Sequence, residues 1–168
     1  MSLAGPAADR RTHAEGGPQA EARIHLRPTL VSLAPGGLLR MEVWLDDPFE
    51  LEGFQFTMTY DSEYLEFEEA SLGPLLGSTG REIVEFPAID RTGAVSYGAA
   101  TLPGRPGASV SGLLAIIKLR AMVEGRSDVA LENVEVTDTA NRPIPTRIGP
   151  ASRVNVRGEI FLPYSGAP

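Results

Sequence analysis

The sequence predicts an all-β domain, a sandwich of about nine antiparallel strands. Apolar and polar residues alternate in several short runs, and 18 glycines and 14 prolines separate these runs from one another. Alternation with a period of two is the pattern of a strand that buries one face. A parallel α/β architecture is not expected, because no helical pattern that could form a crossover lies between the runs.

The expected strands follow one another along the chain as short alternating segments. They cover residues 23–27, 39–46, 54–59, 83–86, 94–100, 113–123, 129–136 and 153–156. A short helix or turn is expected at 62–67, where Asp61 or Ser62 could cap it. The proline-rich stretches 103–106 and 143–145 are expected to be loops.

Alternation also predicts which side chains form the core, and burial of each large one stabilises the fold by about 1.5–3 kcal/mol. The residues expected to face inward are Met41, Val43, Leu45, Phe54, Phe56, Met58, Leu65, Val95, Tyr97, Ile117, Leu119 and Val154.

Composition excludes several classes of partner. The net charge of −7 and the absence of any Lys/Arg run argue against nucleic acid. The chain has no cysteine, which removes disulfides and thiolate metal sites. No apolar stretch approaches the roughly 18 residues that a membrane span requires. The 168 residues suit one domain.

The folded part is expected to span residues 23–158. Residues 1–22 are expected to be a disordered linker or tail, because they lack the hydrophobic centre of a secretory signal. Residues 159–168 are expected to be a C-terminal linker. A domain between two linkers suggests a module of a longer protein.

Five segments, taken in their order and spacing, resemble the cohesin family over about 24–156. Each contributes a glycine-opened or alternating strand with its adjoining turn. They are Ala34-Pro35-Gly36-Gly37 before a strand, Gly53 to Phe67 with its Tyr60-Asp61 and Leu65-Glu66-Phe67, Gly93 to Ala99, Gly112 to Ala121 with Gly125, and Arg153 to Val156.

The resemblance implies a jelly-roll sandwich that is not an enzyme and docks a dockerin-bearing protein. Cohesins serve extracellular polysaccharide-degrading or cell-surface assemblies, so the resemblance also implies an extracellular or cell-surface module of a larger secreted protein. No cofactor is expected on this chain, because calcium belongs to the dockerin partner.

In that family one exposed sheet face contacts the dockerin. Carried over by position, the partner-binding residues are Gln55, Thr57, Pro87, Ile89, Ser96, Gly98, Leu114, Ile116, Lys118 and Asn141, with Gly53 and Ala94 beside them. Many cohesins have Asn or Asp where Gly53 and Gln55 stand, and a larger side chain where Gly98 stands. A homodimer through the uncovered face is the alternative use of this surface.

Catalytic residues are not expected. A Ser-His-Asp triad needs a histidine, and of the two present His13 lies in the tail, whereas His25 is expected to be a solvated surface residue. The acids between Glu63 and Glu69 are expected to form a solvated face rather than a hydrolytic pair. A structural calcium site stays open, although no EF-hand loop occurs.

Trp44 supports the second hypothesis, a carbohydrate-binding module on a related jelly roll. Alternation places it on the polar face with Arg40 and Glu42, where an exposed indole could stack on a glycan. It could equally pack under the N-terminal tail or a loop. A third hypothesis is a structural or adhesive sandwich with neither ligand.

Overall fold

The computed structural model describes residues 21–158, which form eleven strands and no helix. The strands are β1 (Ala22–Arg27), β2 (Leu30–Leu33), β3 (Leu38–Asp46), β4 (Leu51–Thr59), β5 (Leu65–Leu72), β6 (Ile83–Arg91), β7 (Ala94–Thr101), β8 (Gly112–Ala121), β9 (Gly125–Asp138), β10 (Thr146–Ile148) and β11 (Ser152–Val156).

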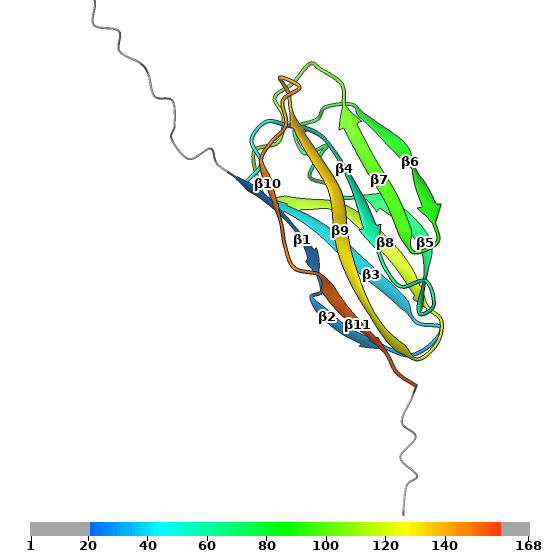
Figure 1. Cartoon of the computed structure of the whole chain (residues 1–168). Coiled ribbons are helices and arrows are strands. Elements are labelled where there is room, and N and C mark those ends of the chain that lie inside the picture. Colours follow the sequence, from blue (N-terminus) through cyan, green and yellow to red (C-terminus); the bar gives the residue numbers. More distant parts are fainter. Residues whose placement is uncertain (1–20, 159–168) are drawn as a thin grey trace, which may run out of the picture.

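The strands form two sheets packed face to face. One sheet has the order β10-β1-β3-β8-β5, and the other has the order β2-β11-β9-β4-β7-β6. Figure 1 shows β9, β4, β7 and β6 side by side, with β3 and β8 behind them. The predicted sandwich is confirmed. The sheets are mixed, however, because β1 pairs with β10 and β2 pairs with β11 in parallel.

All twelve residues predicted to face inward are buried between the sheets. An aromatic cluster lies in this core: the rings of Phe54 and Phe56 stack at 6.0 Å, and Tyr97 meets both edge-on. These rings come from the inner faces of β4 and β7. They leave the alternate residues of the same two strands facing outward.

The helix or turn expected at 62–67 is a turn followed by a strand. The Asp61 carbonyl accepts hydrogen bonds from the backbone N–H groups of Tyr64 and Leu65, and its side chain accepts one from Glu63. β5 then begins at Leu65. The period-two pattern does not predict this strand, because a bulge between Phe67 and Glu69 interrupts its alternation.

The described chain enters and leaves at opposite ends of the sandwich (Figure 1). β1 begins at Ala22 and β11 ends at Val156. The predicted linkers, 1–22 and 159–168, lie almost wholly outside the described residues. Within residues 21–158 no helix is long and apolar enough to traverse a bilayer.

Candidate functional site

Four neighbouring strands of the six-stranded sheet carry an exposed surface that we call the open face. Paired residues in a sheet point to the same side, so the strand registers define it as four rows running from β6 through β7 and β4 to β9. The rows are Val84–Ala100–Gly53–Thr137, Phe86–Gly98–Gln55–Glu135, Ile89–Ser96–Thr57–Glu132 and Arg91–Ala94–Thr59–Ala130.

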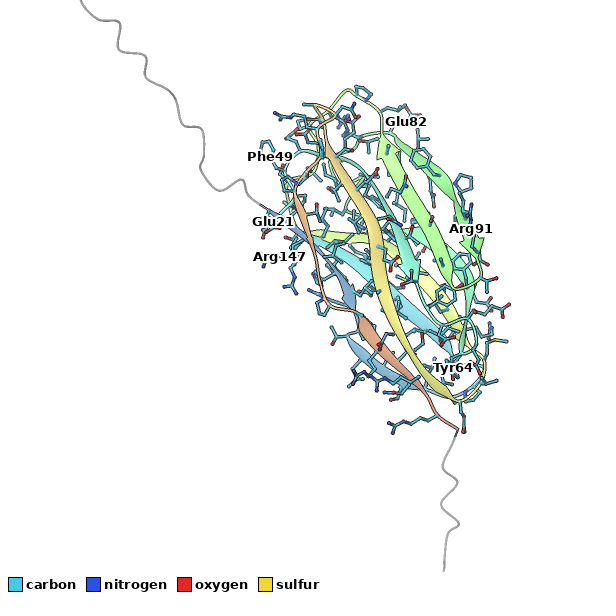
Figure 2. The ribbon with its side chains drawn as sticks, in the orientation of Figure 1. Glu21, Phe49, Tyr64, Glu82, Arg91 and Arg147 are labelled. Atoms are coloured by element: carbon cyan, nitrogen blue, oxygen red, sulfur yellow. The ribbon has the colours of Figure 1, made fainter. Side chains whose placement is uncertain are left out.

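The β6 edge of the open face is apolar. Val84, Phe86 and Ile89 are 42%, 46% and 56% exposed. A bulge separates Phe86 from Ile89 and contains Pro87, whose missing N–H suits an edge strand. Figure 2 marks the two ends of this edge at Glu82 and Arg91. Exposed apolar side chains in a row are the usual centre of a protein-docking surface.

Small residues keep the middle of the open face flat. A Cβ at Gly98 would lie 2.6 Å from the carbonyl oxygen of Phe54, so no side chain fits there without a backbone shift. Beside it, the hydroxyls of Thr57 and Ser96 share a hydrogen bond of 2.9 Å. Gln55 is the exception, because its side chain is exposed between two shallow hollows of about 120 and 140 Å³ that Gly98 and Gly53 leave beside it.

The β9 side of the open face is acidic. Glu132 and Glu135 are both exposed, and each stands opposite a neutral residue of β4. Within residues 21–158 neither carboxylate takes part in an ion pair. The face thus changes from apolar at β6, through neutral, to negatively charged at β9.

Two tyrosines fix the edge strand to the core. The Tyr97 hydroxyl donates a hydrogen bond to Glu85, and the Tyr60 hydroxyl donates one of 3.3 Å to Asp90. Burial, and then the nearby Asp90 carboxylate, raises the pKa of Tyr60 to about 12. Burial and Glu85 raise the pKa of Tyr97 as well. Both phenols therefore stay protonated and remain donors at neutral pH.

Five of the ten predicted partner-binding residues lie on the open face: Gln55, Thr57, Ile89, Ser96 and Gly98. Pro87 lies in the β6 bulge beside them. Asn141 is exposed in the turn that follows β9. Whether any of the ten binds a partner stays a prediction.

The placement of Leu114, Ile116 and Lys118 on the same face is wrong. These residues belong to β8, which pairs with β3 and β5 in the other sheet. Leu114 is fully buried rather than outward. Alternation assigns residues to the two sides of a strand but does not assign the strand to a sheet.

The sequence pattern does not indicate Phe86, Glu132 and Glu135 as site residues. Phe86 ends the alternating run 83–86, which is too short to assign its side. The two glutamates flank a bulge in β9 at which Asn133 adopts a positive φ of 49°. A bulge shifts the alternation by one residue, so a simple period of two cannot place both acids on one face.

Trp44 lies on the opposite outer face of the sandwich and is half-buried. The Arg27 guanidinium lies 4.4 Å from the centroid of the Trp44 ring. The indole N–H of Trp44 donates a hydrogen bond of 2.7 Å to the Glu42 carboxylate. The indole packs against the side chain of Arg27, which ends the neighbouring strand β1. With one ring face covered and its N–H satisfied, Trp44 does not offer a free sugar platform.

His25 is not the solvated residue that the sequence predicts. Its side chain is only 12% exposed, and its Nε2 lies 2.9 Å from a carboxylate oxygen of Asp46 on β3. Gly149 packs against the Cβ of His25, which explains the burial. No third catalytic group accompanies this pair in the contacts of the described chain.

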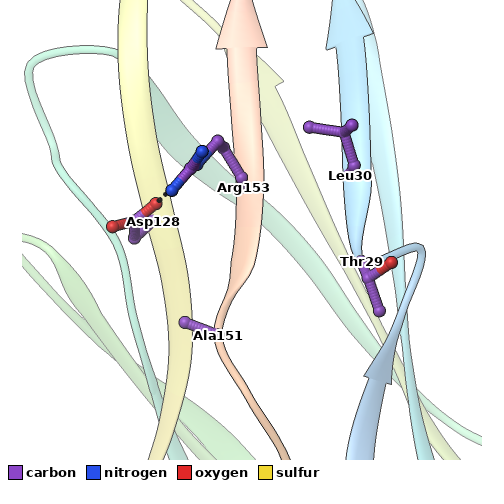
Figure 3. A pocket seen from close by; sticks show the side chains of 5 residues that line it. All are labelled: Thr29, Leu30, Asp128, Ala151 and Arg153. Carbon is purple, nitrogen blue, oxygen red and sulfur yellow. Dashed lines mark ion pairs between the residues drawn. The ribbon is translucent and has the colours of Figure 1, made fainter.

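A hollow of about 330 Å³ lies on the six-stranded sheet beyond the open face (Figure 3). Thr29, Leu30, Asp128, Ala151 and Arg153 line it. Arg153 points toward Asp128 at 3.9 Å, so the two charges in this hollow already face each other. Elsewhere in residues 21–158, no cluster of three or more His, Cys, Asp or Glu residues is placed to hold a metal ion.

These features define a β-sandwich that presents one flat, partly apolar sheet face. Comparison with solved structures identifies its fold as that of the cohesins. A non-cellulosomal cohesin from Archaeoglobus fulgidus superposes with a TM-score of 0.67 at 15% identity, over 84% of this chain and 94% of that one.

Two clostridial structures agree. A cohesin from Clostridium acetobutylicum gives a TM-score of 0.66 at 16% identity, over 84% of this chain and 94% of that one. A type I cohesin–dockerin complex from Clostridium thermocellum gives 0.67 at 12% identity, over 82% and 94%. No family model and no curated protein sequence matches the chain. The domain is therefore cohesin-like by fold.

Proposed function

We propose that the chain is a non-catalytic docking module that binds a dockerin through the open face. The observation that carries this proposal is the exposed row of Val84, Phe86 and Ile89 beside a flat centre of small residues. Support also comes from the fold, since several structures with this fold are complexes with dockerins. An extracellular or cell-surface location would follow from this function.

The test is calorimetric titration of the domain against dockerin modules encoded in the same genome, with calcium and then with a chelator. Calcium is expected on the dockerin, so chelation should abolish binding. Phe86→Asp should weaken binding by about 2 kcal/mol or more, as loss of a central apolar contact does. Phe86 is 46% exposed, so this variant should still fold.

Ile116→Asp is the matched control, because Ile116 is a partly exposed apolar residue on the other sheet. It should bind like the wild type. A loss of binding in Ile116→Asp but not in Phe86→Asp would move the docking surface to β8. Absence of binding to every dockerin would remove the proposed function and leave the fold unaffected.

A further inference from the structure

We propose that the open face accepts its partner in one orientation, with a basic group of the partner over Glu132 and Glu135 and an apolar group over Phe86 and Ile89. This inference rests on the proposed docking function. It adds the chemistry of the partner's surface and names the two residues that select it.

Within residues 21–158, neither Glu132 nor Glu135 has a positively charged partner. Their neighbours across β4 are Thr57 and Gln55, which carry no charge. On its other side β9 pairs with β11 only as far as Val129. Beyond the two acids it meets the segment before β10, where Thr137 bridges to Pro143 and the Ile144 N–H bonds to the Val136 carbonyl, and neither of these contacts brings a cation to Glu132 or Glu135. In contrast, several acids on the other sheet have cationic partners, such as Glu69 with Lys118 at 3.3 Å and Glu68 with Arg120 at 2.5 Å.

The spacing of the strands sets the spacing of the partner's groups. From β6 to β9 there are three inter-strand steps, which amount to about 14 Å. A complementary partner therefore carries Lys or Arg about 14 Å from the apolar residue that covers Phe86. Opposite charges across an interface favour encounter and fix its register.

A partner turned by 180° about the normal to the open face would be disfavoured at both edges. Its basic group would meet the apolar β6 edge and the exposed cation of Arg91, which ends that strand. Its apolar group would cover Glu132 and Glu135 and would remove two unpaired carboxylates from water. Burying an unpaired charge is strongly unfavourable. The gradient across the face therefore permits only one of the two orientations.

The experiment uses the whole domain and the calcium-loaded dockerin that binds it most tightly. The double variant Glu132→Arg/Glu135→Arg should bind roughly tenfold more weakly, mainly through slower association, and should lose most of its salt dependence. The neutral variant Glu132→Gln/Glu135→Gln should fall between this variant and the wild type.

The matched control is Glu63→Arg/Glu124→Arg, which changes net charge equally at exposed positions in the turns before β5 and β9, outside the four rows of the open face. It should leave affinity nearly unchanged. Reversing the charge of the dockerin's contacting Lys or Arg should restore binding to Glu132→Arg/Glu135→Arg only. Thermal unfolding of each variant verifies that it is folded.

Equal effects of the two double reversals on affinity, or no effect of either, would overturn this inference. Weaker binding of Phe86→Asp would then still support docking through the open face. Restored binding after charge reversal on the dockerin confirms both the basic contact and its orientation. If no dockerin binds the wild-type domain, the docking function and this inference fall together.

Discussion

The two outer faces of the sandwich differ in how their charges are matched. On the outer face of β1, β3, β8 and β5, which we call the paired face, cations and anions meet across strands, as in Lys118–Glu69 and Arg120–Glu68. On the open face, the described residues of the four rows form no ion pair, and Glu132 and Glu135 stand among neutral neighbours.

This difference suggests separate roles for two faces that alternate in the same way. Charges that are satisfied within a face give a partner little to complete. Unmatched charges beside an apolar edge leave both hydrophobic contact and electrostatic complementarity to be supplied from outside. The paired face therefore satisfies its charges internally, whereas under the proposed function the open face is the one that binds.

Trp44 lies on the paired face, and its replacement should give the largest loss of stability. Trp44→Ala removes a half-buried indole, its hydrogen bond to Glu42 and its contact with Arg27. We expect the free energy of unfolding to fall by about 2–3 kcal/mol, with dockerin affinity unchanged. Urea denaturation and calorimetry measure the two quantities.

Trp44→Phe is the control, since it keeps an aromatic ring but loses the N–H donor. It should recover part of the stability. Binding of a soluble glycan by the wild type that disappears in Trp44→Ala would contradict the assignment of Trp44 to packing. It would favour the carbohydrate-binding hypothesis.

Gly98 tests the flatness of the open face. In Gly98→Val the new Cβ would approach the Phe54 carbonyl oxygen at 2.6 Å, so β4 and β7 must separate. We expect a loss of about 1–2 kcal/mol in stability and weaker docking. Ala100→Val, one row away on β7 where a Cβ already exists, should leave stability nearly unchanged. Equal losses in the two variants would show that the close approach at Gly98 is unimportant.

Asp138 should make the end of β9 sensitive to acid. Its carboxylate accepts hydrogen bonds from the backbone N–H of Arg142 and of Ala140 and lies 3.1 Å from the Arg142 guanidinium. These contacts hold the pKa of Asp138 below its usual value. A lowered folded-state pKa stabilises the fold above the unfolded value of about 3.9, and this contribution is lost as pH falls toward the folded value.

Asp138→Asn should therefore be less stable at neutral pH and should flatten the stability profile below pH of about 4. Denaturation between pH 2 and pH 7 measures this profile. A variant that keeps the wild-type slope in this range would assign the acid sensitivity to other carboxylates.

The fold and the core could be predicted from the sequence because both depend on the period-two pattern. Phe54, Phe56 and Met58 are buried for the reason that predicted them, namely that alternate residues of a strand face one side. The segment order also indicated the fold that the solved structures share.

The candidate site was only partly predictable because it depends on which strands are neighbours. Gln55 and Ser96 lie on one face because β4 pairs with β7. Ile116 follows the same alternation, but hydrogen bonding places β8 in the other sheet. The bulge in β9 then brings Glu132 and Glu135 onto one face, and no local pattern announces such a bulge.

Lys118 should give the smallest effect and distinguishes the faces directly. Its Nζ lies 3.3 Å from Glu69, and the two side chains are 35% and 59% exposed. A double-mutant cycle with Lys118→Ala and Glu69→Ala should give a coupling of about 0.2–1 kcal/mol that disappears in high salt. The corresponding cycle with Gln55 and Glu135 should give no salt-dependent coupling. Because Lys118 already has its counterion on the paired face, Lys118→Ala should leave dockerin affinity unchanged, whereas a clear loss would place part of the docking surface on β8.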